Sequence, residues 1–298
     1  MRWFVWALVA VICWGAWALI ARLIGDAISP AQSQALSTIG LLPVIALLIL
    51  PVRKQTASTS KWRGVILGCV AGVLTCLGNI AYYYVLNSGT KAATVVPLTA
   101  LYPLVTVLLA LIFLHERLNK IQIAGVCLSL AAIYAFNIKE EQGVLSRWLM
   151  LALLAIILWG VSGFAQKLST NHVSGELSAL SFLGVFVPIA IIILLVEPLK
   201  SNLPPCIWLL SAALGLCFAW GNFAILQAFA NNGKASIIAP LGGLYPLISV
   251  PIALVAFKEK LGFRETIGIV TALLAIIALS LETRHPATQV SRPEPVPK

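Results

Sequence analysis

Two copies of the phrase PLxxLYPL place prolines and tyrosines inside apolar segments of this chain. The first copy begins at Pro97 and the second at Pro240, 143 residues later. Proline has no backbone N–H, and its ring clashes with the carbonyl four residues earlier, so a helix loses a hydrogen bond at each one. We expect kinked helices with freed carbonyls at five prolines: Pro97, Pro103, Pro240, Pro246 and Pro251. Such carbonyls must face protein or a wet cavity, because exposing them to hydrocarbon is costly.

Polar side chains fall on one face of these two helices. At about 100° per residue, the aligned positions form one stripe in each copy: Thr99, Tyr102 and Thr106 in the first, and Gly242, Tyr245 and Ser249 in the second. One interpretation is that the stripe lines a cavity and binds a polar substrate. The alternative is a packing kink whose hydroxyls bond back to their own helix.

Further polar residues lie inside other apolar segments and are additional candidates for substrate binding. Asn79 and Asn222 are aligned at the same spacing of 143 residues. Each could bind a polar substrate, or it could join helices with a hydrogen bond worth about 0.6–2 kcal/mol. Tyr82 and Tyr83 follow Asn79, whereas Gln227 follows Asn222, and this difference between the copies could shape selectivity.

Two tryptophans and two glutamates are also aligned between the copies. Trp14 and Trp159 each precede a glycine within an apolar segment, which suits a cavity wall, although packing toward lipid is the alternative. Glu116 and Glu259 follow the two PLxxLYPL segments. We expect each glutamate to cap the following helix or to pair with a nearby base.

Motifs for enzymatic or metal chemistry are missing. The sequence has no HExxH, no GxSxG, no phosphate-binding loop and no paired aspartates. Its six cysteines form no CxxC pair and are expected to be packing residues. We therefore predict no metal site and no cofactor, and an enzyme is the least favoured class.

The composition indicates a membrane protein. Hydrophobic residues make up 60% of the 298 residues and charged residues 10%, against about 25% charged in soluble domains. Mean hydropathy is +0.98. The lipid bilayer is therefore an expected partner. We interpret the net charge of +10 as membrane orientation rather than nucleic-acid binding.

The hydropathy pattern predicts an all-α integral membrane protein with ten transmembrane helices. A spanning helix needs roughly 20 apolar residues. Polar and Gly/Pro breaks delimit ten such segments: 3–23, 31–51, 64–87, 92–114, 120–138, 147–167, 177–196, 205–230, 235–257 and 264–282. The first is longer than the apolar core of a signal peptide, so we expect it to be a retained span.

An internal repeat divides these spans into two sets of five. Residues 1–140 form the predicted first repeat and residues 141–282 the second, and residues 283–298 are a predicted disordered tail. Because five is odd, the second repeat would enter the membrane from the opposite face, giving inverted repeats around a central cavity. With the N-terminus inside, inside segments carry 12 of the 20 Lys and Arg residues. We therefore expect both termini and the tail to be cytoplasmic.

Together, these features resemble the EamA family of the drug/metabolite transporter superfamily. The resemblance rests on WG in the first helix of each repeat, on PLxxLYPL, and on the segment Ile112–Leu118 that contains Glu116. The second copy departs from the pattern, with Lys260 after Glu259 where the first copy has Arg117. The resemblance implies a basket-shaped bundle that moves small metabolites by alternating access, with amino-acid-like export favoured, in a bacterial inner or plasma membrane.

The leading hypothesis is therefore a secondary transporter for a small polar or zwitterionic metabolite. No Asp or Glu lies near the middle of a predicted span, which disfavours export driven by an embedded carboxylate. The main alternative is a membrane scaffold or regulator. Gly64, Gly68 and Gly72 form small-xxx-small steps that permit close helix contact, either within the chain or in a homodimer.

Overall fold

The computed structural model describes residues 2–53, 61–136, 147–200 and 202–281, and none of these residues lies in a β-strand. The predicted tail and most of the basic connection at 52–63 lie outside the described residues. The helices are α1 (Arg2–Ile24), the short 3-10 turn η1 (Gly25–Ala27), α2 (Pro30–Arg53), α3 (Lys61–Asn87), α4 (Ala92–Thr99), α5 (Pro103–Phe113), α6 (Lys120–Phe136), α7 (Arg147–Thr170), α8 (Gly175–Gly184), α9 (Phe186–Val196), α10 (Pro205–Ala230), α11 (Ala235–Gly242), α12 (Pro246–Ala256) and α13 (Phe263–Ser280).

Nine helical stretches in the described part of the chain are long and apolar enough to cross a membrane. The remaining predicted span, the fifth at 120–138, corresponds to α6, an apolar helix of 17 residues. Residues 137 and 138 lie outside the described ranges. The expectation of many membrane-spanning helices is thus confirmed, and the count of ten remains a prediction.

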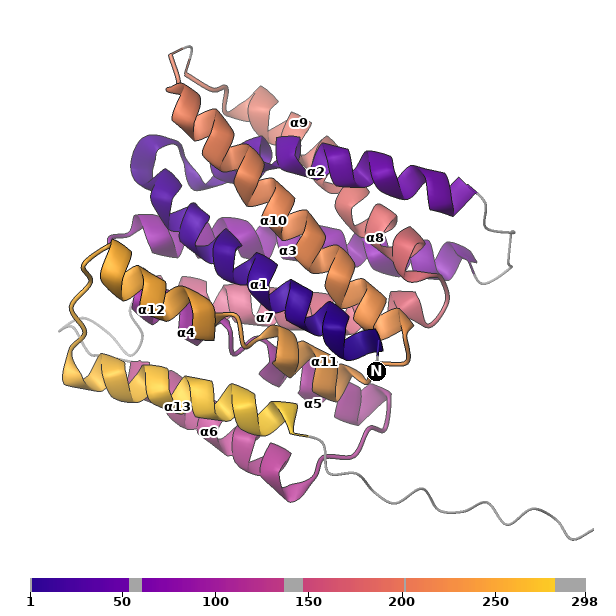
Figure 1. The fold of residues 1–298 in the computed structure, drawn as a ribbon, viewed down its shortest axis with the longest axis vertical. Coiled ribbons are helices and arrows are strands. Elements are labelled where there is room, and N and C mark those ends of the chain that lie inside the picture. Colours follow the sequence, from indigo (N-terminus) through magenta and orange to yellow (C-terminus); the bar gives the residue numbers. More distant parts are fainter. Residues whose placement is uncertain (1, 54–60, 137–146, 201, 282–298) are drawn as a thin grey trace, which may run out of the picture.

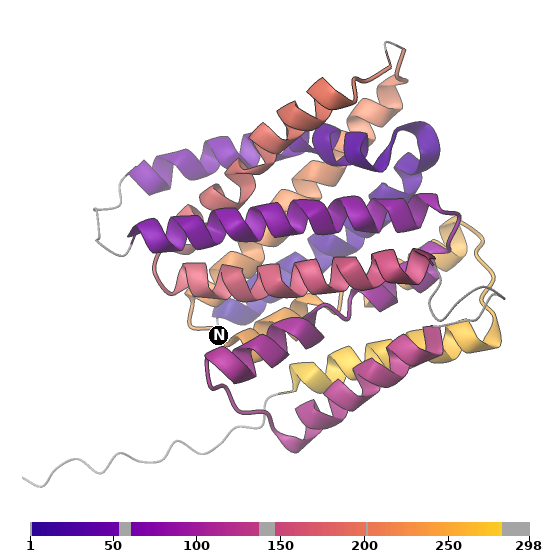
Figure 2. The same ribbon diagram turned by 180° about the vertical axis from the view of Figure 1, so that it is seen from behind.

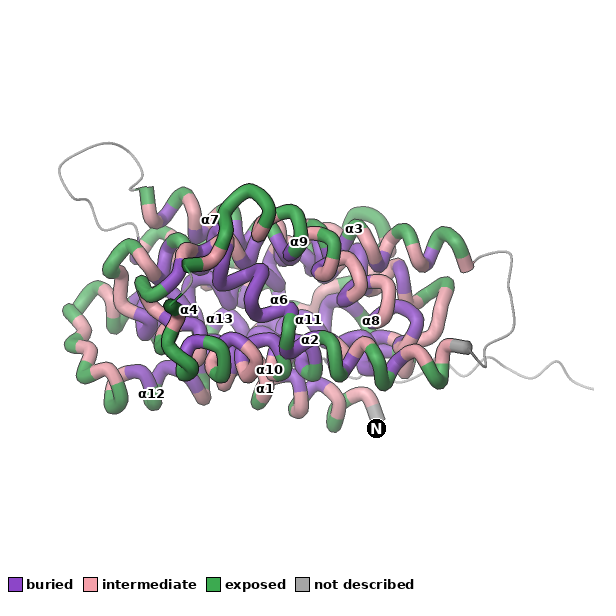
Figure 3. The backbone as a smooth tube through the Cα atoms, turned by 90° about the horizontal axis from the view of Figure 1, so that it is seen from above, coloured by how far each residue is buried: buried purple, intermediate pink, exposed green. Residues whose placement is uncertain are grey.

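The helices pack side by side with their axes broadly aligned. Figure 1 shows α1 beside α10 and α6 beside α13, and Figure 2 shows α3 beside α7. Buried backbone lies inside the bundle and exposed backbone on its outside (Figure 3). Many large apolar side chains are exposed there, such as Leu209 and Val255, as expected for a surface that meets lipid.

Both PLxxLYPL segments break their helices. The predicted single spans 92–114 and 235–257 are the helix pairs α4/α5 and α11/α12, separated by short turns. Pro103 and Pro246 are the first residues of α5 and α12, where a missing N–H costs nothing. Pro97, Pro240 and Pro251 lie inside helices. In both segments the change of direction is a turn that ends one helix and starts the next, and each segment is still one candidate membrane span.

The seventh predicted span, 177–196, also breaks, which the sequence reasoning did not anticipate. Helix α8 ends at Gly184 and α9 begins at Phe186. Pro188, in the first turn of α9, cannot donate to the carbonyl of Gly184. By contrast, α2 contains Pro43 and Pro51 and remains a single helix.

We refer to the described residues between 2 and 136 as the first half, and to those between 147 and 281 as the second half. Their closest contacts are reciprocal. A Cβ atom on Gly72 would collide with the carbonyl of Phe182, and one on Gly215, its aligned partner, would collide with the carbonyl of Ser37. Small residues thus let backbones of opposite halves touch. The glycine step at Gly72 is used inside the chain.

Each half also caps a broken helix of the other half. The backbone N–H groups of Ala92 and Ala93, at the start of α4, donate to the two carboxylate oxygens of Glu259 over 2.8 Å each. Those of Ala235 and Ser236, at the start of α11, donate to Glu116 over 3.2 and 3.0 Å. The glutamates therefore cap helices, as expected, but not the helices that follow them in sequence.

Local backbone conformation aims these two carboxylates. His115 and Lys258, which immediately precede the glutamates, have positive φ angles of 54° and 52°. Such left-handed residues are uncommon outside glycine, and here they occur at aligned positions. The α5–α6 and α12–α13 connections that carry them lie at opposite ends of the bundle (Figure 1).

Candidate functional site

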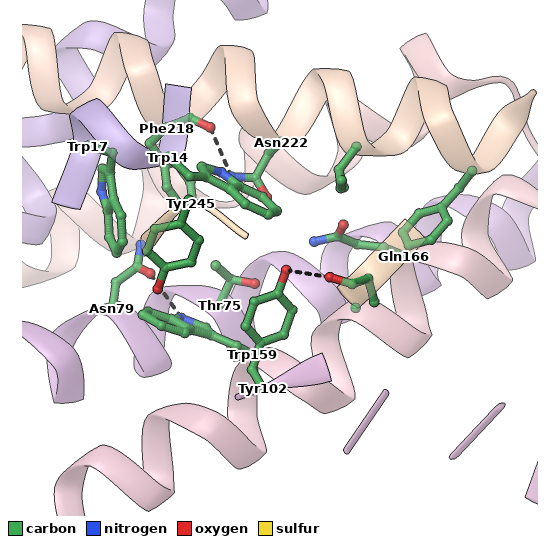
Figure 4. A pocket seen from close by; sticks show the side chains of 14 residues that line it. Trp14, Trp17, Thr75, Asn79, Tyr102, Trp159, Gln166, Phe218, Asn222 and Tyr245 are labelled. Atoms are coloured by element: carbon green, nitrogen blue, oxygen red, sulfur yellow. Dashed lines mark hydrogen bonds between the residues drawn. The ribbon is translucent and has the colours of Figure 1, made fainter. Parts of the chain in front are cut away.

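A cavity lies where the two halves meet, beside both breaks of the PLxxLYPL segments (Figure 4). The volume of this cavity is about 60 Å³, several times what one water molecule needs. The described residues that line it are Trp14, Trp17, Thr75, Asn79, Tyr102, Trp159, Gly163, Gln166, Phe218, Asn222, Ile225, Phe229, Ala239 and Tyr245.

The two predicted tryptophans line this cavity, and each is seated on a glycine of the opposite half. A Cβ atom on Gly221 would lie 2.5 Å from Cδ1 of Trp14, and one on Gly78 would lie 2.6 Å from Cδ1 of Trp159. These glycines precede Asn222 and Asn79. The aligned Gly-Asn pairs therefore provide the space into which the indole rings fit.

The aligned tyrosines both pack against Trp14. The ring centroids of Tyr102 and Tyr245 are each 6.4 Å from that of Trp14, in edge-to-face arrangements. The Tyr102 hydroxyl donates to the carbonyl of Ala239 over 3.5 Å. The buried Tyr245 hydroxyl makes no well-formed hydrogen bond among the described residues, although the Thr99 side chain lies close to it. The breaks thus bring both tyrosines to one site.

The aligned asparagines also line the cavity, but their hydrogen bonds differ. Asn79 accepts a hydrogen bond from Nε1 of Trp159 over 3.1 Å. Asn222 instead donates to the carbonyl of Phe218, within its own helix, over 2.9 Å. The Asn79 bond joins the two halves, whereas the Asn222 bond leaves the side-chain oxygen of that residue free to accept.

Thr99, Thr106 and Ser249, predicted to face the cavity, do not line it. Thr99 donates back to the carbonyl of Val95 over 2.9 Å, and Ser249 donates back to that of Tyr245 over 3.3 Å. Thr106 donates to the carbonyl of Gly160 on α7 over 2.8 Å. The regular-helix stripe fails because the helix breaks between Thr99 and Thr106, so the hydroxyls satisfy backbone groups instead.

Tyr82, Tyr83 and Gln227 also lie outside the cavity lining. Tyr82 stacks on Trp17 with ring centroids 5.0 Å apart, and Tyr83 accepts a hydrogen bond from Nε1 of Trp17 over 3.2 Å. The Gln227 amide donates to Glu176, near the start of α8, over 2.5 Å. The two tyrosines therefore support a lining residue.

Two of the backbone carbonyls that the prolines were expected to free accept hydrogen bonds from other groups of the protein. That of Thr99 accepts from the backbone N–H of Tyr102 over 3.2 Å. That of Ser236 accepts from the Gln122 side chain on α6 over 3.3 Å. These two acceptors therefore serve the fold rather than a ligand.

Sequence reasoning missed several polar and aromatic lining residues. The missed residues stand at helical spacings from predicted ones: Trp17 three residues after Trp14, Thr75 four before Asn79, Phe218 four before Asn222, and Gln166 seven after Trp159. Such spacings place side chains on one helix face. A helical wheel centred on the aligned Trp and Asn residues would have found them.

The chemistry of the lining suits binding rather than catalysis. Its described side chains are aromatic, apolar, hydroxyl or amide groups, and none carries a charge. No cluster of three or more His, Cys, Asp and Glu side chains was found in the described ranges. The site can therefore hold a solute through hydrogen bonds and ring contacts.

Known proteins provide an independent comparison. A protein of Streptantibioticus cattleyicolor named as a probable terminal-alkyne amino-acid exporter is 27% identical over 229 residues, 72% of this chain and 74% of that protein. An uncharacterized transporter of Archaeoglobus fulgidus is 23% identical over 206 residues, 69% of this chain and 72% of that protein.

A solved crystal structure shares the fold. It aligns with a TM-score of 0.67 at 18% identity, over 93% of this chain and 97% of that one. The likeness to this structure supports the helical arrangement alone.

The EamA-like transporter family model matches residues 1–138 and again 146–281. With the apolar helices, this match identifies an integral, multi-pass membrane protein. The relatives named as transporters point to a transporter rather than an enzyme. The resemblance drawn from the sequence is confirmed: the chain belongs to the EamA-like transporter family of the drug/metabolite transporter superfamily.

Proposed function

We propose that this protein is a secondary transporter that moves a small polar or zwitterionic metabolite across a membrane by alternating access. Amino-acid-like export is the favoured activity, in keeping with the name of the Streptantibioticus relative. One observation carries the proposal: the cavity is built from aligned residues of both halves, beside two broken helices. Transporters of several folds bind substrate at the interface of such repeats.

The mechanism we propose uses the two repeats, residues 1–140 and 141–282, as inverted five-helix units. Reciprocal contacts such as Gly72 with Phe182 and Gly215 with Ser37 support this division. Rocking of one unit against the other would open the cavity first to one side and then to the other. The breaks beside Tyr102 and Tyr245 are the flexible points of this motion.

The proposed setting is a bacterial inner or plasma membrane, with both termini cytoplasmic. The excess of Lys and Arg in the segments assigned to the inside supports this orientation. The proposed partners are the lipid bilayer and the small-molecule substrate. The glycine step at Gly72 no longer argues for a homodimer, because its contact lies within the chain.

A flux screen in proteoliposomes tests this function. Purified protein would be reconstituted and offered labelled amino acids, sugars and nucleosides. We expect saturable flux of at least one solute, reduced about tenfold or more by Tyr102→Ala and by Tyr245→Ala, since each loss removes a wall of a packed site. Size-exclusion profiles check that the variants remain folded.

Two outcomes would count against the proposal. Folded wild-type protein that moves no solute above protein-free liposomes would contradict transport. Wild-type flux that survives both tyrosine substitutions unchanged would contradict the assignment of the cavity as the binding site.

A further inference from the structure

The two walls of the cavity are chemically unequal, although the sequence repeat aligns them. Thr75 of α3 aligns with Phe218 of α10 at the offset of 143 residues, and Ser162 of α7 aligns with Trp17 of α1 at an offset of 145. At these aligned positions α3 and α7 carry hydroxyl side chains where α1 and α10 carry aromatic ones. We call the lining residues Thr75 and Gln166 the polar wall, and the lining residues Trp17 and Phe218 the aromatic wall; Ser162 is not a lining residue but bonds to Thr75.

The polar wall has unused hydrogen-bonding capacity. Ser162 donates to the carbonyl of Ala71 over 2.8 Å, so it accepts from the Thr75 hydroxyl at 2.6 Å. The Thr75 oxygen therefore remains free to accept. Gln166 is only 5% exposed, yet its amide makes a single long contact of 3.5 Å, to Ser162. Its carbonyl oxygen has no partner among the described residues.

The Gln166 carbonyl oxygen is not among the buried unpaired atoms of the described residues, so it is open to the cavity and can accept a hydrogen bond from a ligand or water. Gln166 lines the cavity and points into it (Figure 4). It offers both an acceptor and N–H donors on one rigid helix. A solute bearing a donor and an acceptor close together would satisfy both.

The aromatic wall is preformed by ring packing. Trp17 and Phe218 have centroids 6.0 Å apart, and Phe218 lies 5.3 Å from Phe186. Trp17 is held by its stack on Tyr82 and its hydrogen bond to Tyr83. This wall offers a fixed apolar surface to the rest of the solute.

Among the described residues, no charged side chain lines the cavity. Lys167, which follows Gln166, is not a lining residue. Arg22 donates to the carbonyl of Leu86 over 2.9 Å and lies 4.0 Å from Glu259. A solute with net charge would therefore be buried in this lining without a counter-ion, which is unfavourable.

We propose that the cavity selects a small amphipathic solute of zero net charge, whose polar head bonds to Gln166 and Thr75 while its apolar part packs against Trp17 and Phe218. Gln166 is the main specificity-determining residue. An uncharged or zwitterionic head fits this site. This inference rests on the proposed transport function.

Four related solutes test the inference in proteoliposomes: L-phenylalanine, L-alanine, 2-phenylethylamine and 3-phenylpropionate. The first two are zwitterions with and without a ring, the third is a cation and the fourth an anion. Each is used to compete with the best substrate from the flux screen. We expect phenylalanine to compete at least tenfold better than either charged analogue, and better than alanine.

Substitutions of Gln166 sharpen the test. Gln166→Leu should lower the apparent affinity for the zwitterion about tenfold or more. Gln166→Glu adds a carboxylate and should shift the preference toward 2-phenylethylamine, a gain that misfolding cannot produce. The matched control is Gln34→Leu, the same change at a buried glutamine of α2 that does not line the cavity.

The outcomes separate this inference from the proposed function. Wild-type flux of a solute with net charge, in preference to the zwitterions, would overturn the inference and leave transport intact. So would an unchanged preference in Gln166→Glu. Absence of any flux from folded protein would defeat the proposed function, and this inference with it.

Discussion

Trp14 and Trp159 occupy aligned positions, fit over aligned glycines and line the same cavity, but only one of them bonds to an asparagine. Nε1 of Trp159 donates to Asn79, while no hydrogen bond is present for Nε1 of Trp14 within the described chain. The sequence repeat thus predicts shared placement but not shared bonding. The Asn222 side chain instead donates to the Phe218 carbonyl of its own helix. The surroundings of Trp14 and Trp159 are therefore not equivalent.

This difference predicts that replacing Trp by Phe has unequal effects on stability at Trp159 and at Trp14. Trp159→Phe and Trp14→Phe remove the same ring volume, but only the first leaves the Asn79 oxygen unpaired. Trp159→Phe should therefore lower the free energy of unfolding by about 1 kcal/mol more than Trp14→Phe. Denaturant titration in mixed micelles measures both. Equal losses, or a larger loss for Trp14→Phe, would show that the hydrogen bond contributes nothing.

At the scale of elements, the broken helices α4 and α11 depend on carboxylates from the opposite half. An N-terminal turn has unpaired N–H groups and a partial positive charge, which a carboxylate satisfies. Glu259 meets two such groups at α4, and Glu116 meets two at α11. Because a break creates a new helix start inside the protein, it also creates the need for these caps.

Removing either cap should destabilise the protein. We expect Glu116→Ala and Glu259→Ala each to lower the free energy of unfolding by about 1 kcal/mol. The Glu→Gln variants should fall between wild type and alanine, because an amide oxygen still accepts but carries no charge. Thermal unfolding in detergent provides the measurement.

Glu197→Ala is the matched control for the two caps. Glu197 is exposed at the end of α9, and its carboxylate caps no helix, so its loss should change stability by less than about 0.5 kcal/mol. If the alanine variants of the two capping glutamates melt like this control, the caps do not hold the broken helices.

The sequence predicted these elements unevenly, for physical reasons. The apolar runs located the helices, and the repeat identified Tyr102 and Tyr245 as a pair that the structure brings to one cavity. The breaks were underestimated, because a proline ring can kink or end a helix depending on what packs around it. Thr99 was misplaced for that reason, since its stripe assumed an unbroken helix.

The partners of Glu116 were not readable from local sequence either. Its contacts at the start of α11 are 119 and 120 residues away in the sequence. Helical periodicity relates only residues a few positions apart, so it could not predict these contacts. Gln166 was missed although its spacing from Trp159 is helical. The available signal was a polar residue in an apolar span. The sequence reasoning used it for Gln227, which lies near an aligned asparagine, but not for Gln166.

For the whole molecule, the proposed inverted topology makes a prediction about which side of the membrane each connection faces. The start of α3 and the α9–α10 connection lie at opposite ends of the bundle (Figures 1 and 2); Lys61 is the first residue of α3, and Lys200 belongs to that connection. In a variant without native cysteines, Lys200→Cys should react with an impermeant maleimide on intact cells. Lys61→Cys should react only after permeabilisation. Labelling of both from the same side would contradict the proposed orientation of the repeats.

A cavity shared by two halves can act as a carrier only if it opens to one side at a time. Counterflow in proteoliposomes tests this directly. Vesicles are loaded with unlabelled substrate from the flux screen and diluted into a trace of labelled substrate. Alternating access predicts a transient accumulation of label inside, above its outside concentration, that is lost without the internal load. Label that only equilibrates, with or without the load, would contradict alternating access through this cavity.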